Sequence, residues 1–276
     1  MFGVTFSAFG TFLHEVATSI GKFEVRAQKE SIFTMGFLNM FWAFLFFLIL
    51  MFLRNSFIFS LASLPTFTAR VFLEILQTHS SLIAVSRADR TTFSFVNIIT
   101  IPFLLLVDNI LGYKIGSLQL LGMGIIFVAL LFLFLKHGLK KEGLGFVLFS
   151  SINAVATISL FKYNITYFNS VEAEQSLIIA ILLFYLLMCA KFFAKENPMQ
   201  FFKKPLFFLQ SATSGAGSVA MSFAYVFAPA SIIVTAKRSF TIFWSILSGS
   251  IYFHEKHTAL KFAAMIFLIL GVILLI

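Results

Sequence analysis

Long apolar runs joined by short polar connections are the feature that most constrains this chain. A helix of ~20 residues crosses the ~30 Å hydrocarbon core of a bilayer, and runs of that length cover nearly all of the 276 residues. The chain is 60% hydrophobic and 11% charged, whereas soluble domains are ~25% charged. We therefore predict an all-α polytopic membrane protein with ten transmembrane helices, at residues 3–22, 31–53, 66–86, 91–111, 116–135, 143–163, 171–192, 205–226, 231–253 and 258–276.

A weak internal repeat divides the chain into a first five-helix repeat, residues 1–138, and a second, residues 139–276. Because each half has an odd number of spans, the second half must enter the membrane in the opposite sense. Inverted repeats with a site between the halves are typical of transporters. The matches, at offsets of 140 and 142, include Gly3/Gly143, Ser19/Ser159, Lys22/Lys162, Ser80/Ser222 and Lys114/Lys256.

The basic residues lie mainly in the short loops. With the predicted spans, the loops on one side hold 14 Lys and Arg residues and those on the other side 4. The positive-inside rule then places both termini outside the cytoplasm of a cell (inner) membrane. The net charge of +9 is therefore ascribed to anionic lipid headgroups and not to nucleic acid.

Lys237 and Arg238 stand inside the ninth predicted span. Each cation costs roughly 2.5–3.5 kcal/mol at the centre of a spanning helix. Something inside the protein must face them: a carboxylate, a water-filled cavity or an anionic ligand. Thr241 and Ser245 share the helix face of Lys237, and we expect these four residues to bind substrate.

The third span carries Arg70 and Glu74 at a spacing of four residues, which places them on one helix face. One interpretation is an ion pair that satisfies itself near a helix end. The other is that Glu74 or Arg70 faces Lys237 or Arg238 across a cavity, as part of the substrate site. His79 lies off this face and is expected to pack against a neighbouring helix.

Polar residues in other spans have two uses. Asn97 and Asn153 belong to polar stripes that either bond helix to helix, the commoner use, or line a substrate pathway. Glu15 lies deep in the first span with His14 beside it. A buried acid keeps its proton unless it is paired, so Glu15 is a candidate proton carrier, and the titratable His14 is a second one. The alternative for Glu15 is a structural pair with a basic residue.

The sequence has no pattern of a membrane enzyme or of a bound cofactor. It lacks GxxxxGK[ST], HExxH, GxSxG and DDxxD. The single Cys189 can form no internal disulfide and makes no metal site by itself. We therefore expect no enzyme activity, no cofactor and no metal.

Segments that end each half resemble the EamA-type ten-helix group of the drug/metabolite transporter superfamily. In the second half these are Ala228 to Ser231, Ile246 to Lys256 and Leu270 to Leu274; in the first half they are Ala84 to Pro102 and Gly122 to Leu135. The chain departs from the family at Asp108, where a Glu would be expected, and at Lys237 and Arg238, where many members are apolar. The family's frequent cytoplasmic termini also conflict with the charge count.

The resemblance implies alternating-access transport of a small polar or amphipathic metabolite across the inner membrane, often as export. Together with the charged residues, it predicts a secondary transporter of a small polar or anionic metabolite, such as an amino acid or organic acid, through a central cavity. Protons are the candidate coupling ion, membrane lipids are partners, and the chain is a monomer or homodimer. The alternatives are a flippase for a lipid-linked anion and a non-transporting membrane scaffold.

Overall fold

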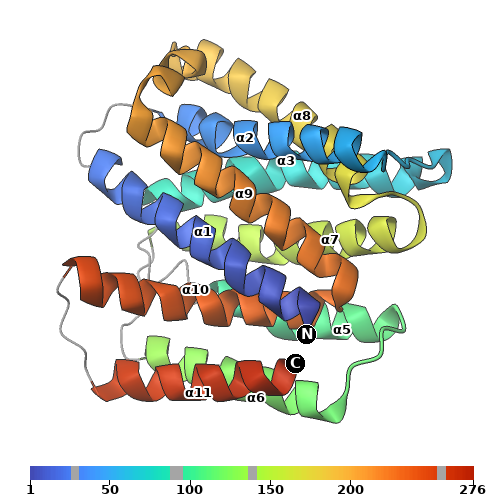
Figure 1. The fold of residues 1–276 in the computed structure, drawn as a ribbon, viewed down its shortest axis with the longest axis vertical. Coiled ribbons are helices and arrows are strands. Elements are labelled where there is room, and N and C mark those ends of the chain that lie inside the picture. The colour runs from blue at the N-terminus through green and yellow to red at the C-terminus, as the bar shows by residue number, and fades with distance from the viewer. Residues whose placement is uncertain (26–30, 88–95, 136–141, 254–258) are drawn as a thin grey trace.

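The computed structural model describes residues 1–25, 31–87, 96–135, 142–253 and 259–276 (Figure 1). Within these ranges every regular element is helical. The α-helices are α1 (Phe2–Val25), α2 (Ile32–Arg54), α3 (Leu64–Arg87), α5 (Thr100–Ile110), α6 (Ser117–Leu135), α7 (Leu144–Tyr167), α8 (Val171–Cys189), α9 (Pro205–Phe227), α10 (Ala230–Phe253) and α11 (Ala259–Leu275). Short helical turns are η1 (Leu61–Ser63), η2 (Asn97–Ile99), η3 (Ala190–Ala194) and η4 (Pro198–Lys203).

The all-α prediction is confirmed for the described residues. Four helical segments there are long and apolar enough to cross a membrane: Ile32–Arg54, Leu144–Tyr167, Val171–Ala194 and Ala230–Leu247. These segments support a membrane protein, and the full count of ten spans stays a prediction. The predicted boundary between residues 138 and 139 lies outside the described residues.

The fourth predicted span has an irregular start. Its residues 91–95 lie outside the described ranges, and the part that follows is the 3₁₀ turn η2 and then α5. Pro102 is the third residue of α5, and η2 leads directly into this helix with helical backbone angles. The proline therefore lies in the first turn of α5.

The helices lie side by side in a bundle (Figure 1). α1 packs along α9 and α10, α3 packs along α7, and α6 packs along α11. The C-terminal ends of α1, α3 and α10 and the N-terminal end of α7 lie toward the left of Figure 1. We call this end of the bundle the left end and the other the right end.

Glycine allows α9 to approach its neighbours closely. A Cβ at Gly217 would lie 2.9 Å from the Gly10 carbonyl oxygen of α1, and one at Gly215 would lie 2.6 Å from the Ala43 nitrogen of α2. A Cβ at Gly3 would lie 2.9 Å from Ile233 of α10. No larger residue fits these positions unless the helices separate, which explains the small-residue run in the sequence of α9.

The antiparallel pair α2 and α8 is tied at both ends by a carboxylate. At one end Arg54 Nη1 lies 2.8 Å from Glu172 Oε1. At the other end Glu196 Oε2 accepts hydrogen bonds from the Ser31 hydroxyl at 2.7 Å and the Thr34 hydroxyl at 2.5 Å. The Ser31 backbone N–H also donates to this carboxylate, at 3.0 Å. Glu196 thereby satisfies donors at the start of α2 that have no partner within the helix.

Replacing Gly215 with Ala is expected to lower the free energy of unfolding by about 1–3 kcal/mol, because the added methyl group overpacks the contact between α9 and α2. The measurement is thermal unfolding of the detergent-purified protein. Gly145→Ala is the control, since a Cβ there meets nothing within 4 Å. Equal unfolding temperatures for the two variants would contradict the close packing at Gly215.

The Glu196 contacts predict a pH-dependent stabilisation. Burial raises the pKa of this carboxyl, but the hydrogen bonds from Thr34 and Ser31 outweigh it and hold its pKa below the usual value. The contribution is therefore complete above the unfolded pKa of about 4.3 and is lost as pH falls through the folded pKa. We expect Glu196→Gln to cost ~1 kcal/mol at pH 7, the usual size of a helix-cap effect, and much less at pH 3.5.

The control for this experiment is Glu142→Gln, because Glu142 is exposed and makes no described hydrogen bond. Its effect on thermal unfolding should be near zero at both pH values. A Glu196→Gln effect of the same size at pH 3.5 and pH 7 would show that the carboxylate charge does not matter.

Candidate functional site

A polar face of α10 becomes steadily more accessible toward the left end of the bundle. Residues four or three apart lie on one side of a helix. Along this side Val234 is buried, Lys237 is half-buried, and Thr241 and Ser245 are exposed. The exposed Thr241 hydroxyl donates to the Lys237 carbonyl of its own helix at 2.7 Å.

The same order appears on α1, which packs along α10. On its polar side Ser7 and Thr11 are buried, His14 is half-buried and Thr18 is exposed. The opposite side of α1 carries phenylalanines, Phe6, Phe9 and Phe12, which are all exposed. Thr18 therefore does not point to the apolar side, and the polar faces of α1 and α10 both become more exposed toward the left end.

The two cations of α10 have few partners in the part of the chain that the structure describes. Arg238 Nη2 donates to Asn97 Oδ1 of η2 at 3.1 Å, and its buried Nε has no hydrogen-bond partner. Lys237 makes no described hydrogen bond, and no carboxylate among the described residues lies within ion-pair distance of either cation. His14 is the titratable group close enough to Lys237 to interact with it electrostatically.

Arg70 and Glu74 form an ion pair on α3, and Arg70 also pairs with a carboxylate of α8. Arg70 Nη2 lies 3.3 Å from Glu74 Oε1. Its other terminal nitrogen, Nη1, lies 2.8 Å from Glu174 Oε1. Among the described residues, neither Arg70 nor Glu74 pairs with Lys237 or Arg238. The second interpretation required an ion pair with Lys237 or Arg238 across a cavity. The described residues show no such ion pair.

Glu174 is the residue that sequence reasoning missed. Its side chain is fully buried at the start of α8, and besides Arg70 it accepts hydrogen bonds from Asn164 at 2.9 Å and Asn169 at 2.6 Å. A carboxylate in an apolar span is itself a signal, and it was available in the sequence. Because both Glu174 oxygens are satisfied, Glu174 fixes the position of Arg70.

The charges are therefore separated across the inside of the bundle. On α3 and α8, the carboxylates Glu74 and Glu174 share one guanidinium. On α10, two cations have no described carboxylate. Two aromatic rings lie between these groups: Arg70 stacks over Phe161 at 4.5 Å, and Phe161 meets Tyr225 edge-on at 5.6 Å. Tyr225 in turn is within electrostatic reach of Arg238 and Glu74.

The structure brings together only part of the predicted site. Ser245 donates to Glu15 Oε2 at 3.4 Å, so Glu15 lies beside the accessible face of α10. Asn153 instead ties α7 to α3, donating to the Leu73 carbonyl at 2.8 Å and to Gln77 Oε1 at 3.0 Å. Asn153 therefore follows the interhelical alternative, whereas Asn97 contacts Arg238.

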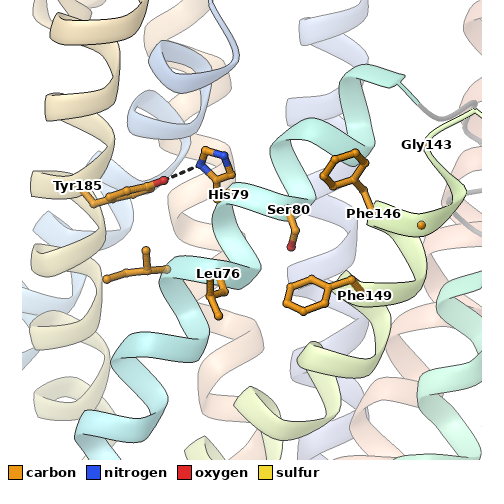
Figure 2. Close-up of a pocket in the computed structure, with 9 residues that line it drawn as sticks. Leu76, His79, Ser80, Gly143, Phe146, Phe149 and Tyr185 are labelled. Atoms are coloured by element: carbon orange, nitrogen blue, oxygen red, sulfur yellow. Dashed lines mark hydrogen bonds between the residues drawn. The ribbon is translucent and has the colours of Figure 1, made fainter.

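A hollow in the surface of the bundle lies elsewhere. A hollow of about 710 Å³ opens between α3, α7 and α8, as Figure 2 shows. His79 hydrogen-bonds through Nδ1 to the Tyr185 hydroxyl at 2.5 Å there, in agreement with its predicted packing against a neighbouring helix. None of the predicted substrate-binding residues lines this hollow.

No cluster of three or more His, Cys, Asp or Glu side chains that could hold a metal ion occurs in the described ranges. Cys189 is buried and free.

Comparisons with known proteins bear on the fold alone. No family model and no curated protein matches the chain. It is similar to a solved structure described only as "Crystal structure of protein", with a TM-score of 0.75 and 9% sequence identity, over 99% of this chain and 95% of that chain. At this identity the similarity shows a shared helical fold over nearly the whole length.

The Arg70–Glu174 contact predicts a large difference between two neighbouring glutamates. Glu174→Gln leaves a buried guanidinium without its main counter-charge and should cost about 3 kcal/mol or more. Glu172→Gln removes a pair whose Arg54 side chain is 56% exposed, and such pairs contribute ~0–1 kcal/mol. Thermal unfolding of the two purified variants measures both, and equal losses would show that Glu174 does not anchor Arg70.

Proposed function

We propose that this protein is a secondary transporter that exports a small polar or anionic metabolite. The observation that carries the proposal is the pair of cations on α10, Lys237 and Arg238, which have no described carboxylate partner. They lie on a helix face that becomes accessible toward one end of the bundle. Unpaired charges inside an apolar bundle are costly, and an anionic ligand that enters from the left end would offset that cost.

The charge separation favours a substrate with two opposite charges. A carboxylate would bind Lys237 and Arg238. An ammonium group would be attracted to the side of Glu74 and Glu174, where two carboxylates share one arginine. An amino acid carries both groups, so within the proposed class we favour amino acids over simple organic acids.

The contrast between the two ends supports alternating access. Toward the right end α1 meets α9 and α10 through contacts that admit no Cβ at Gly3 or Gly10. Toward the left end the polar faces of α1 and α10 are accessible at Thr18, Thr241 and Ser245. In a transporter that opens one end at a time, this arrangement corresponds to the state that is open at the left end.

The pattern of helix contacts supports two inverted repeats of five spans. If each helix of the first half corresponds to the helix five spans later, then α1 packing on α9 corresponds to α7 packing on α3. In the same way α1 on α10 corresponds to α7 on α5. The pairs α2–α8, α5–α10 and α6–α11 each join a helix to its own counterpart, and all these pairs are in contact.

On this proposal the protein is an EamA-type member of the drug/metabolite transporter superfamily in the inner membrane, and it is not an enzyme. Glu15 and His14 are the candidates for proton coupling, because Glu15 accepts a hydrogen bond from Ser245 of α10 and His14 is near Lys237.

The test is transport in proteoliposomes that contain the purified protein. Candidate amino acids and organic acids are first screened by thermal shift, since a ligand at ~100 times its dissociation constant adds about 2.7 kcal/mol of stability. Lys237→Ala should abolish uptake of the ligand that is found, and insertion into the membrane should be unchanged. Lys114→Ala, at an exposed loop cation, is the matched control and should transport normally.

Transport by Lys237→Ala at the wild-type rate would overturn the assigned role of this residue. Absence of binding and transport for every amino acid and organic acid would favour the non-transporting scaffold or the lipid-linked cargo over the proposed function.

A further inference from the structure

The hollow between α3, α7 and α8 has mostly apolar walls. Leu76 and Ile75 of α3 and Phe146 and Phe149 of α7 line it, and Figure 2 shows the two phenylalanine rings facing α3. Phe146 and Phe149 are exposed, so the hollow is a groove in the outer surface of the bundle. Its volume of about 710 Å³ lies within the ~300–1,000 Å³ range of ligand-binding pockets.

The polar groups of the groove already have partners. The His79 ring hydrogen-bonds to Tyr185 at 2.5 Å, and the Ser80 hydroxyl donates to the Gln77 carbonyl of its own helix at 3.2 Å. A polar solute would therefore find few free partners in the groove, whereas an apolar chain would displace water from Leu76, Phe146 and Phe149.

The groove is separated from the space beside Lys237. Behind it α3 and α7 are joined by hydrogen bonds from Gln77 to Ser150 at 2.8 Å and between Ser81 and Ser150 at 2.7 Å. Since each residue advances about 100° around a helix, Gln77 and Ser81 lie on average about 100° around α3 from Leu76 and Ser80, and neither lines the groove. An occupant of the groove is therefore not on the proposed substrate path.

A cation marks the rim of the groove at the left end of the bundle. The exposed Arg87 places its guanidinium over the Phe146 ring, 5.4 Å from the ring centre. No described carboxylate lies within ion-pair distance of Arg87. Arg87 and Leu76 are eleven residues apart on α3, or ~16 Å along the axis. This distance matches one leaflet of a bilayer whose hydrocarbon core is ~30 Å thick.

We propose that this groove binds an anionic phospholipid of the surrounding bilayer. One acyl chain lies along Leu76, Phe146 and Phe149, and the phosphate group lies at Arg87. An apolar groove beside an exposed cation that has no carboxylate within ion-pair distance in the described ranges is complementary to such a lipid in shape and in charge. The site goes beyond the proposed transport function and depends only on the protein lying in a membrane.

The test is competition between two lipids for the full-length protein in detergent. Phosphatidylglycerol and phosphatidylcholine with identical acyl chains are added in equal amounts, and native mass spectrometry counts the lipids that stay bound. For the wild-type protein we expect about five-fold more bound phosphatidylglycerol, the ratio for the ~1 kcal/mol that one basic residue contributes to anionic-lipid binding.

Two variants separate the charge from the groove. Arg87→Gln should bring the lipid ratio to about one and still bind lipid; Lys114→Gln, at an exposed cation in the loop after α5, should keep the wild-type ratio. Leu76→Trp should fill the groove and lose both lipids. Its control is Leu121→Trp, at a leucine that is 54% exposed on α6, which should bind as the wild type does.

A lipid ratio near one for the wild-type protein, or an unchanged ratio in Arg87→Gln, would overturn the headgroup assignment. Full lipid retention by a folded Leu76→Trp protein would overturn the groove itself. Because transport is not the readout, either result leaves the proposed function to its own test.

Discussion

A charge inside an apolar bundle must meet an opposite charge, and this constraint organises the interior of the protein. Arg70 meets it with two carboxylates: Glu174 and Glu74 bind its two terminal nitrogens, and Phe161 covers its face. Lys237 and Arg238 meet it only in part, because Asn97 is the one side chain that hydrogen-bonds either of them in the described ranges. The first cluster contains its own counter-charges, whereas the second has no carboxylate within ion-pair distance among the residues that the structure describes.

Close packing and accessibility are divided between the two ends of the bundle. Glycines let α9 contact α1 and α2 at distances that exclude a Cβ, so these helices act as a tight unit. At the left end the polar faces of α1 and α10 stay accessible. Closely packed helices beside cations that have no described carboxylate partner, with polar faces exposed toward one end, form the arrangement that our proposed transport mechanism requires.

Part of the candidate site was predictable, and the reasons for the failures are physical. Lys237 was recognisable because a cation in an apolar span is costly wherever its neighbours lie. The role of Asn153 was open, since a sequence does not tell whether an amide meets another helix or a pathway. Glu174 was overlooked, although an acid in an apolar span is an equally strong signal. Its partner Arg70 lies 104 residues away, and only helix packing brings the two together.

The sequence by itself determined the class of the protein and the approximate place of its helices. Long apolar runs leave the backbone no alternative to helix in a bilayer, because every peptide group must be hydrogen-bonded within its own segment. Tertiary structure alone decided which charges are paired, which helix faces are accessible, and that α3, α7 and α8 leave a groove beneath Arg87. These features depend on contacts between residues far apart in the chain, and apolar periodicity carries no information about such contacts.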